Sequence, residues 1–377
     1  MRILLFADIH IGSIKDTTYV YNVLTDIIEK EVIFKKTDMV VILGDYFHRL
    51  FKVNEEYVSC AINVMNYLIR ACKRSNTKIR IVYGTESHEM NQYRLFNYHF
   101  TSSKVDIKLF DTVAEEEIDG KKILYVPEEY INSKHKFYKN TLYSGKQYDY
   151  IFGHGMIEDG MPAAISFGGP KSDEKQVPRF KSGEFSEISK ITAFGHYHCY
   201  SNMNDKVFYV GSLFRDSFGE EIPKGYGIIE NDVFTFVENS QAYVFKTYEF
   251  DVNSSVYESS DNIIREIDKI KSEHPNIFNG DQHGKIRIIF KTPENVDVSF
   301  KENLKTILFN DKYISPLIKE TSSEVIEDAK EEVSDEYDFI LDSSMNITDK
   351  IHRYITKKYD DPMSLEELTM YINESYK

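Results

Sequence analysis

The chain of 377 residues is poor in cysteine, has no long apolar run and carries an excess of acidic side chains. Its cysteines, Cys60, Cys72 and Cys199, show no CxxC spacing. That scarcity argues against a disulfide framework or a thiolate zinc site and favours a reducing compartment. No apolar stretch reaches the length of a membrane span, and the N-terminal one is too short for a signal peptide. We therefore expect a soluble protein without membrane contact, located in the cytoplasm.

The formal net charge of -15 is the opposite of the basic footprint typical of general nucleic-acid-binding proteins. The acidic residues are concentrated in residues 324–342, where Lys330 is the single base. Basic residues gather in residues 70–80, 134–139 and 171–190. Such runs are more often solvated surface than a track for DNA, so the charge leaves nucleic-acid binding open as the less favoured reading.

Side chains of the kind that bind metals stand in five clusters, each at the end of a short apolar run. The runs are bounded by glycine and polar residues, which is typical of buried strands. They cover residues 3–7, 39–43, 79–83, 150–152 and 191–194. The clusters that follow are Asp8-Ile9-His10, Gly44-Asp45, Ser87-His88, Gly153-His154 and Gly195-His196-Tyr197-His198. Ligands at successive strand ends predict a single site on one edge of a sheet.

The types of side chain in these clusters indicate a divalent cation. Carboxylates with imidazoles, and no cysteine, suit Mn, Mg, Fe or Zn. Asp8 and His10 share one face of a strand because the side-chain period of a strand is two. Glycines before Asp45, His154 and His196 allow the backbone to turn tightly at the strand ends. A lone Asp-x-His is a weak signal, but five such clusters in series are a strong one.

The pattern along the chain predicts an α/β fold with appended parts. Residues 1–242 alternate strand-like runs with helical patterns at 17–30 and 55–73, which indicates a layered α/β domain. Short strands in residues 207–236 are expected to form an antiparallel sheet that continues it. Residues 246–320 predict a small α+β domain in the order β-α-β-α-β, with a helix at 299–308. The long connection 155–184 is a candidate functional loop.

The C-terminal part predicts a linker and a helical hairpin. Residues 324–342 form an acidic linker of low apolar content. Residues 343–377 carry two short amphipathic helices separated by Pro362, the second opening with a capping box from Ser364 to Glu367. Two such helices bury little surface by themselves. They either pack back on the preceding domain or dock on a partner protein.

The five clusters, with Gly44-Asp45-Tyr46-Phe47-His48 and Ser87-His88-Glu89 as they stand here, resemble the calcineurin-like metallophosphoesterases. Within that superfamily the chain is most similar to the Mre11/SbcD DNA nuclease branch, including its phage members. The resemblance is close over the first 200 residues and rests on layout beyond residue 246. It implies a layered β-sandwich flanked by helices, a capping and DNA-binding α+β domain, and a hairpin that docks an ATPase.

The resemblance also implies a site for two Mn²⁺ ions, with Mg²⁺ or another divalent ion as alternatives. In it Asp8, His10 and His198 hold one ion and His154 and His196 the other, with Asp45 as the bridge. His88 takes the place of the family's catalytic histidine. His48 either supports a metal ligand without binding the ion itself or lies near the DNA path, and an ordinary structural role is an equal alternative.

One departure concerns the third cluster, which in the family reads Gly-Asn-His with the asparagine as a ligand. Here the chain reads Gly84-Thr85-Glu86-Ser87-His88. We assign Ser87 to the asparagine position as a weaker ligand, with Glu86 or a water held by Thr85 as alternatives. The loss of the asparagine has two possible consequences to test: weaker binding of the second ion, or an inactive site.

The resemblance implies a Mn-dependent DNA nuclease, exonuclease or endonuclease, that hydrolyses phosphodiesters with metal-activated water. It would be a subunit of an SbcCD/Mre11-Rad50-like complex of DNA repair and recombination in a bacterial or phage-infected cell. Its partners would be DNA, an SbcC/Rad50-like coiled-coil ATPase and a second copy in a homodimer. The alternatives are a phosphatase of the same superfamily and a weakly active scaffold subunit.

Overall fold

The computed structural model describes residues 1–160, 177–251 without 219 and 221, 260–293 without 281 and 282, and 311–321 without 312. Two compact units divide the chain, Met1–Thr247 with Lys271–Arg287, and Tyr248–Ile270 with the chain from Ile288 onward. The predicted helix at 299–308, the acidic linker and the C-terminal hairpin lie outside the described residues, as does most of the 155–184 connection.

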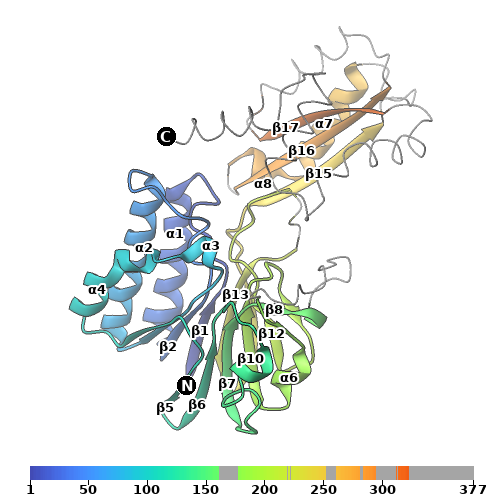
Figure 1. Ribbon diagram of the computed structural model, residues 1–377. Coiled ribbons are helices and arrows are strands. Elements are labelled where there is room, and N and C mark those ends of the chain that lie inside the picture. The colour runs from blue at the N-terminus through green and yellow to red at the C-terminus, as the bar shows by residue number, and fades with distance from the viewer. Residues whose placement is uncertain are drawn as a thin grey trace, which may run out of the picture. The chain divides into compact units, whose positions relative to one another are not determined.

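The first unit contains two six-stranded sheets (Figure 1). The first sheet has the order β14-β13-β1-β2-β3-β4, in which β1 to β4 are parallel and β13 and β14 are antiparallel. Its strands are β1 (Arg2–Phe6), β2 (Met39–Leu43), β3 (Lys78–Val82), β4 (Ile107–Phe110), β13 (Gly225–Glu230) and β14 (Val233–Glu238).

The second sheet has the order β11-β12-β10-β7-β6-β5, and its central strands β12, β10, β7 and β6 are parallel. Its strands are β5 (Ala114–Ile118), β6 (Lys121–Val126), β7 (Tyr148–His154), β10 (Ser189–Gly195), β11 (Ser201–Asn202) and β12 (Val207–Tyr209). A separate two-stranded ribbon pairs β8 (Met156–Ile157) with β9 (Arg179–Phe180).

Helices cover the outer faces of the sandwich. The carboxylate of Asp16 accepts a hydrogen bond from the Tyr19 amide (2.9 Å) and starts the first long helix, while Asn76 ends the second in the left-handed region. The α-helices are α1 (Thr17–Ile28), α2 (Glu56–Ser75), α3 (Glu86–Glu89), α4 (Asn97–Ser102), α5 (Lys134–Phe137) and α6 (Ser182–Ser186). A π-helical segment, Glu29–Phe34, continues α1, and 3₁₀ turns occupy Gln92–Phe96 and Glu158–Gly160.

The alternation of side chains along each strand builds the layers. In β1, Leu4 and Phe6 join the apolar cluster formed with α1 and α2, whereas Ile3 and Leu5 join the cluster between the two sheets. A third cluster on the far face of the second sheet includes Phe185 of α6. Every residue of β1 and β2 is therefore buried, as expected for parallel strands covered on both faces.

The predicted α/β class, the five buried strands and both helices are confirmed. Two expectations were wrong. The metal-type clusters follow strands of two sheets, not one, since β1, β2 and β3 belong to the first sheet and β7 and β10 to the second. The strands of 207–236 do not form one antiparallel sheet: β12 extends the second sheet in parallel, and β13 and β14 extend the first. A strand pattern shows burial but does not identify the partner strand.

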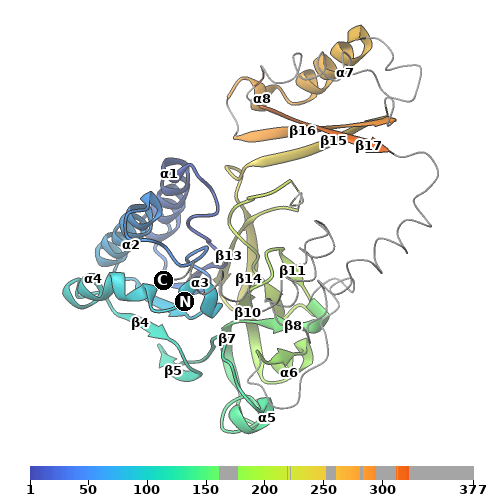
Figure 2. The ribbon, with the colours of Figure 1, turned by 45° about the horizontal axis from the view of Figure 1, so that its top comes forward.

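A further sheet has three strands in the order β15-β16-β17, with helix α7 on one face (Figure 2), and the second unit contributes residues to each of these elements. The strands are β15 (Val244–Asp251), β16 (Gly284–Pro293) and β17 (Ile314–Thr321), and the helix is α7 (Ser260–Glu273). The short helix α8 (Pro275–Phe278) belongs to the Lys271–Arg287 part of the first unit. Ile263, Ile267 and Ile270 are buried at helical spacing. Across the described ranges, no helix combines the length and apolarity needed to cross a membrane.

Candidate metal centre

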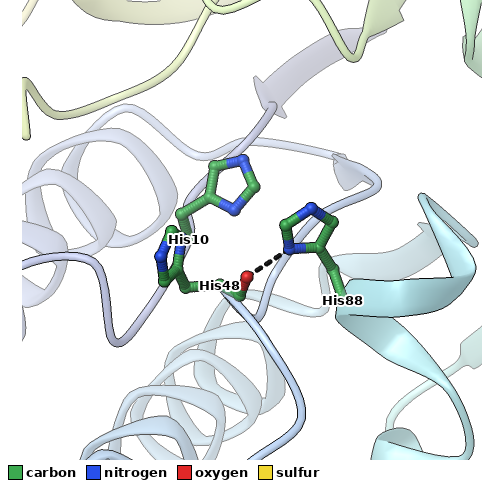
Figure 3. Close-up of side chains that lie close together, drawn as sticks. All are labelled: His10, His48 and His88. Atoms are coloured by element: carbon green, nitrogen blue, oxygen red, sulfur yellow. Dashed lines mark hydrogen bonds between the residues drawn. The ribbon is translucent and has the colours of Figure 1, made fainter. Parts of the chain in front are cut away.

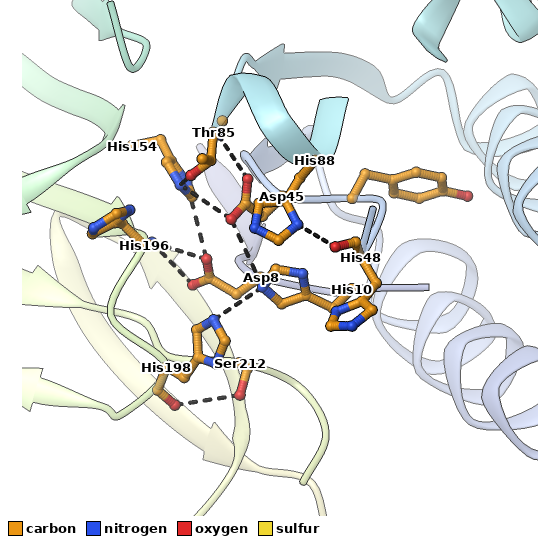
Figure 4. Close-up of polar contacts among 12 residues, drawn as sticks. Asp8, His10, Asp45, His48, Thr85, His88, His154, His196, His198 and Ser212 are labelled. Carbon is orange, nitrogen blue, oxygen red and sulfur yellow. Dashed lines mark hydrogen bonds and ion pairs between the residues drawn. The ribbon is translucent and has the colours of Figure 1, made fainter. Parts of the chain in front are cut away.

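The predicted ligands converge where the carboxyl ends of the strands of both sheets meet (Figure 4). Asp8 and His10 follow β1, Asp45 follows β2, His154 ends β7 and His196 follows β10. The loops after β1 and β2 are joined by backbone hydrogen bonds, from Asp8 to Gly44 (3.3 Å) and from His10 to Asp45 (3.0 Å). The tertiary structure thus brings Asp8 next to His196, which lies 188 positions further along the chain.

One set of donors is formed by Asp8, His10 and His198, whose candidate ligand atoms all lie within 4.8 Å of one another. The Nε2 atoms of His10 and His198 face each other at 2.9 Å. Asp8 is fixed by the backbone amide of His196, which lies 2.9 and 3.1 Å from its two carboxylate oxygens. The structure thus brings together the three side chains that were predicted to hold the first ion.

A second set contains His154 and His196 together with Glu128, again within 4.8 Å. The Nδ1 of His154 lies 2.8 Å from the carbonyl oxygen of Leu43, and as an N–H it donates to that oxygen. In the neutral ring this hydrogen bond leaves the lone pair on Nε2, which is the form in which imidazole binds metals. The Nδ1 of His196 is 3.2 Å from Glu128, so the carboxylate faces the same space as both rings.

Asp45 lies between the two sets. Its Oδ2 is 3.7 Å from the Nε2 of His10 and 3.5 Å from the Nε2 of His154. Its Oδ1 accepts a hydrogen bond from the backbone amide of Thr85 (2.7 Å), which fixes the orientation of the carboxylate. One oxygen is therefore held by the protein while the other points at both donor sets, as a bridging ligand requires.

The backbone at the site is strained. Asp8, His10, Asp45 and His196 have positive φ angles of 47°, 48°, 50° and 98°. For residues other than glycine this conformation costs about 1–3 kcal/mol each and is concentrated at functional sites. A Cβ at Gly84 would collide with the backbone and side chain of Asp45, which explains the glycine at that position.

Burial and the charges of neighbouring side chains compete in setting the pKa values of the site. It raises the pKa of Asp8 despite the neighbouring imidazole of His154, and it lowers the pKa of His10 to about 3. For His154, burial alone would lower the pKa, but the carboxylates of Asp45 and Asp8 outweigh it and hold the pKa well above the ordinary value. Buried carboxylates that draw a proton onto a buried imidazole form an environment suited to a cation. The donor set of carboxylate oxygens and imidazole nitrogens fits a hard or borderline divalent ion.

His88 and His48 form a group with His10 beside the first donor set (Figure 3). The Nδ1 of His88 makes a short hydrogen bond with the carbonyl oxygen of His48, so it carries the hydrogen and donates. The ring of His88 is 5.0 Å from the ring of His10, centroid to centroid. His48 thus contacts His88 through its backbone, and burial lowers the pKa of its ring. The predicted role of the His48 side chain stays a prediction.

The third cluster differs from the sequence assignment. Ser87 is exposed on α3, and the contacts with Asp45 and His154 are made by Thr85, directly after Gly84. The Thr85 hydroxyl oxygen is 3.4 Å from the Nε2 of His154. Thr85 therefore takes the position directly after Gly84, where the family has asparagine. The two extra residues, Glu86 and Ser87, lie between Thr85 and His88. Ser87 as a ligand stays a prediction.

Two acidic residues near the ligands were not identified from the sequence. Glu128 follows β6, and the same rule that singled out acids after buried strands could have found it. Glu220 gives no such signal: its Oε1 lies 3.8 Å from the Nδ1 of His198 and accepts a hydrogen bond from Lys224 (2.7 Å). Burial would lower the pKa of His198, and Glu220 raises it. A carboxylate behind an imidazole orients it for metal binding.

Glu89 holds together two of the loops that carry the site. It is fully buried, and its carboxylate accepts hydrogen bonds from the amides of Tyr46 and Gly84 and from the hydroxyl of Tyr93. Burial, with the nearby charge of Asp45, raises the pKa of Glu89 to about 7. The side chain thereby ties the loop after β2 to the loop after β3.

We expect Glu89→Gln to destabilise the protein by about 1–3 kcal/mol, the cost of a buried donor without an acceptor. A protonated carboxyl oxygen keeps a lone pair, whereas the amide nitrogen of glutamine would face an N–H or O–H donor with none. Chemical denaturation measures the change. The control is Glu86→Gln on the exposed face of the same short helix. Equal stability of the two variants would contradict the bracing role of Glu89.

Comparison with known proteins gives one family match. The model described as calcineurin-like phosphoesterase matches residues 1–200. No curated protein matches the chain. Among solved structures, a protein of unknown function from Aquifex aeolicus is 14% identical, with a TM-score of 0.23, and the match covers 50% of this chain and 93% of that one. A glutamine-dependent NAD⁺ synthetase from Acinetobacter baumannii, in complex with ADP, is 12% identical, with a TM-score of 0.27. That match covers 97% of this chain and 69% of the synthetase. Scores this low carry no structural argument.

Proposed function

Because the chain belongs to the calcineurin-like phosphoesterase family, we propose that it is a metal-dependent phosphodiesterase acting on DNA, a nuclease of the SbcD type. Hydrolysis of a phosphoester with divalent metal follows from the family and its donor set. The choice of DNA and of Mn²⁺ is the proposal. The observation that carries hydrolysis at two ions is the position of Asp45 between two donor sets. A third group of histidines, His10, His48 and His88, lies at its side.

The protein side chains divide the work of hydrolysis. Divalent cations, when bound, polarise the phosphate and lower the pKa of water. Asp8, His10 and His198 would hold one and His154 and His196 the other, with Asp45 facing both. Leu43 and Glu220 orient two of the imidazoles through His154 Nδ1 and His198 Nδ1.

His88 is the residue best placed for proton transfer. Its Nδ1 hydrogen is committed to the carbonyl oxygen of His48, so Nε2 is the atom that exchanges a proton. A protonated Nε2 can donate to the leaving oxygen of the phosphodiester or to a charged oxygen in the transition state. The His48 carbonyl thereby sets the orientation and tautomer of His88.

The sequence from Gly44 to His48 and the additional α+β unit support a DNA nuclease over a phosphatase. A phosphatase of the family requires neither the second unit nor the C-terminal hairpin that the sequence predicts, whereas both agree with the layout of the nuclease branch. The net charge of -15 is consistent with DNA binding if bound cations and a partner supply positive charge.

Substrate preference tests the proposal. We expect the full chain with Mn²⁺ to cleave plasmid or hairpin DNA and bis-p-nitrophenyl phosphate, with p-nitrophenyl phosphate turned over far more slowly, and EDTA to stop all cleavage. The Asp45→Asn variant is the control for a contaminating nuclease. Rapid turnover of the monoester without DNA cleavage would favour the phosphatase instead, and no turnover of any substrate would favour the scaffold subunit.

A partner for the C-terminal part belongs to the same proposal. Residues 343–377 are proposed to dock a coiled-coil ATPase of the SbcC/Rad50 type, because their apolar stripes are too small to form a core and follow an acidic linker. Deleting them should leave Mn-dependent activity of the isolated chain within about twofold, since every ligand lies between Asp8 and His198. A pull-down should show loss of the ATPase, and full-strength binding by the truncated chain would contradict the docking role. Sedimentation of the full chain and of the truncated chain measures their molar masses and so tests the proposed homodimer.

A further inference from the structure

The second donor set contains a carboxylate that the family pattern does not provide. Glu128 comes from the loop after β6, and its side chain is 2% exposed. Its Oε2 lies 3.2 Å from the Nδ1 of His196 and 3.9 Å from the Nε2 of His154. Candidate ligand atoms of Glu128, His154 and His196 all lie within 4.8 Å of one another. The carboxylate therefore occupies a position from which it can share a cation with them.

The same position compensates for what the third cluster lacks. The amide side chain expected after Gly84 is replaced by Thr85, whose hydroxyl is shorter and lies 3.4 Å from Glu128 Oε2. The backbone amide of Glu128 donates to the carbonyl of Tyr83 (3.1 Å), just before the Gly84-Thr85 turn. The loop after β6 is thereby held against the loop after β3, across the two sheets. The missing amide oxygen and the extra carboxylate are adjacent.

Electrostatics favours the same assignment. Asp8, Asp45 and Glu128 are three buried carboxylates around His154. Burying several anions together is costly unless a cation neutralises them. An asparagine would have added no charge to this set, whereas Glu128 adds one anion on the side of His154 and His196.

We propose that Glu128 is a ligand of the ion held by His154 and His196, and that it takes the role of the asparagine missing from the third cluster. This inference rests on the proposed two-ion site. Thr85 acts with it: its amide positions Asp45 and its hydroxyl approaches the Glu128 carboxylate. The substitution exchanges a neutral amide oxygen for a charged oxygen. The second ion is therefore not weakened by the loss of asparagine.

Calorimetric titration of the full, metal-free chain with Mn²⁺ tests the assignment without use of activity. We expect two ions per wild-type chain. Glu128→Ala should keep one ion at unchanged affinity and bind the second at least about tenfold more weakly, since even residues that only support a ligand change metal affinity by about 10–100-fold. Glu128→Gln, which offers an amide oxygen in place of the carboxylate oxygen, should lose less affinity for the second ion than Glu128→Ala. Thr85→Asn in the Glu128→Ala chain should restore part of the affinity.

The matched control is Glu129→Gln, which removes the same charge one residue further along. The Glu129 carboxylate contacts the Val113 amide (3.1 Å) and the Tyr138 hydroxyl (3.4 Å), away from the donor sets. It should bind both ions as the wild type does. Unchanged binding of both ions by Glu128→Ala and Glu128→Gln would overturn the role of Glu128 alone. A wild-type chain that binds fewer than two ions would overturn it together with the two-ion site.

Discussion

Replacing Asp45 by asparagine should reduce metal-dependent hydrolysis of a phosphodiester by about 10³-fold or more. The carboxylate has one oxygen fixed by the Thr85 amide and the other directed at His10 and His154. In the variant, the fixed position needs an acceptor and takes the amide oxygen, so the NH₂ group points at both donor sets. A loss of about 4 kcal/mol, within the several kcal/mol that metal ions contribute to catalysis, corresponds to about 10³ in rate.

The measurement combines initial rates on bis-p-nitrophenyl phosphate with a Mn²⁺ titration and a thermal melt. A melting temperature close to that of the wild type would show that the loss arises at the site. Asp149→Asn, which removes a carboxylate paired with Lys190 at the surface, is the matched control and should keep the wild-type rate. Asp45→Asn with near-normal turnover would refute the bridging assignment.

Replacing His88 by glutamine should lower the rate by about 10²–10⁴-fold, the usual contribution of a proton-transfer group, while metal binding stays unchanged. The glutamine amide can still donate to the His48 carbonyl, so the loop geometry is kept. It cannot accept and return a proton as the imidazole Nε2 does. The rate loss should therefore lie in turnover at saturating Mn²⁺, with the Mn²⁺ titration curve in its original place.

His99→Gln on α4 is the control, because His99 belongs to none of the donor sets found among the described residues. If Mn²⁺ affinity falls in His88→Gln and high Mn²⁺ restores the rate, His88 is a ligand and its assigned role is incorrect. A rate within threefold of the wild type at all Mn²⁺ concentrations would show that proton transfer by His88 is not needed.

The sequence by itself determined the local elements, and it singled out most of the metal-type side chains that the structure brings together. An apolar run of strand length ending in an acid or a histidine recurs often enough that chance is a poor explanation. Asp8, His10, Asp45, His154 and His196 were found because each stands at such an end. The helical spacing of apolar residues gave α1 and α2 for the same reason: burial of one face leaves a period in the sequence.

The tertiary structure decided what depends on partners distant in the chain. Periodicity records that a strand is buried but not beside which strand, so the division of the ligands between two sheets was not visible. Thr85 rather than Ser87 contacts Asp45 because the turn after Gly84 sets the position, not the distance to His88. Glu128 and Glu220 acquire their partners only when β6 and the loop after β12 reach His196 and His198. The sequence shows which chemical groups a side chain carries, but only the folded chain determines which side chains of the other sheet lie next to it.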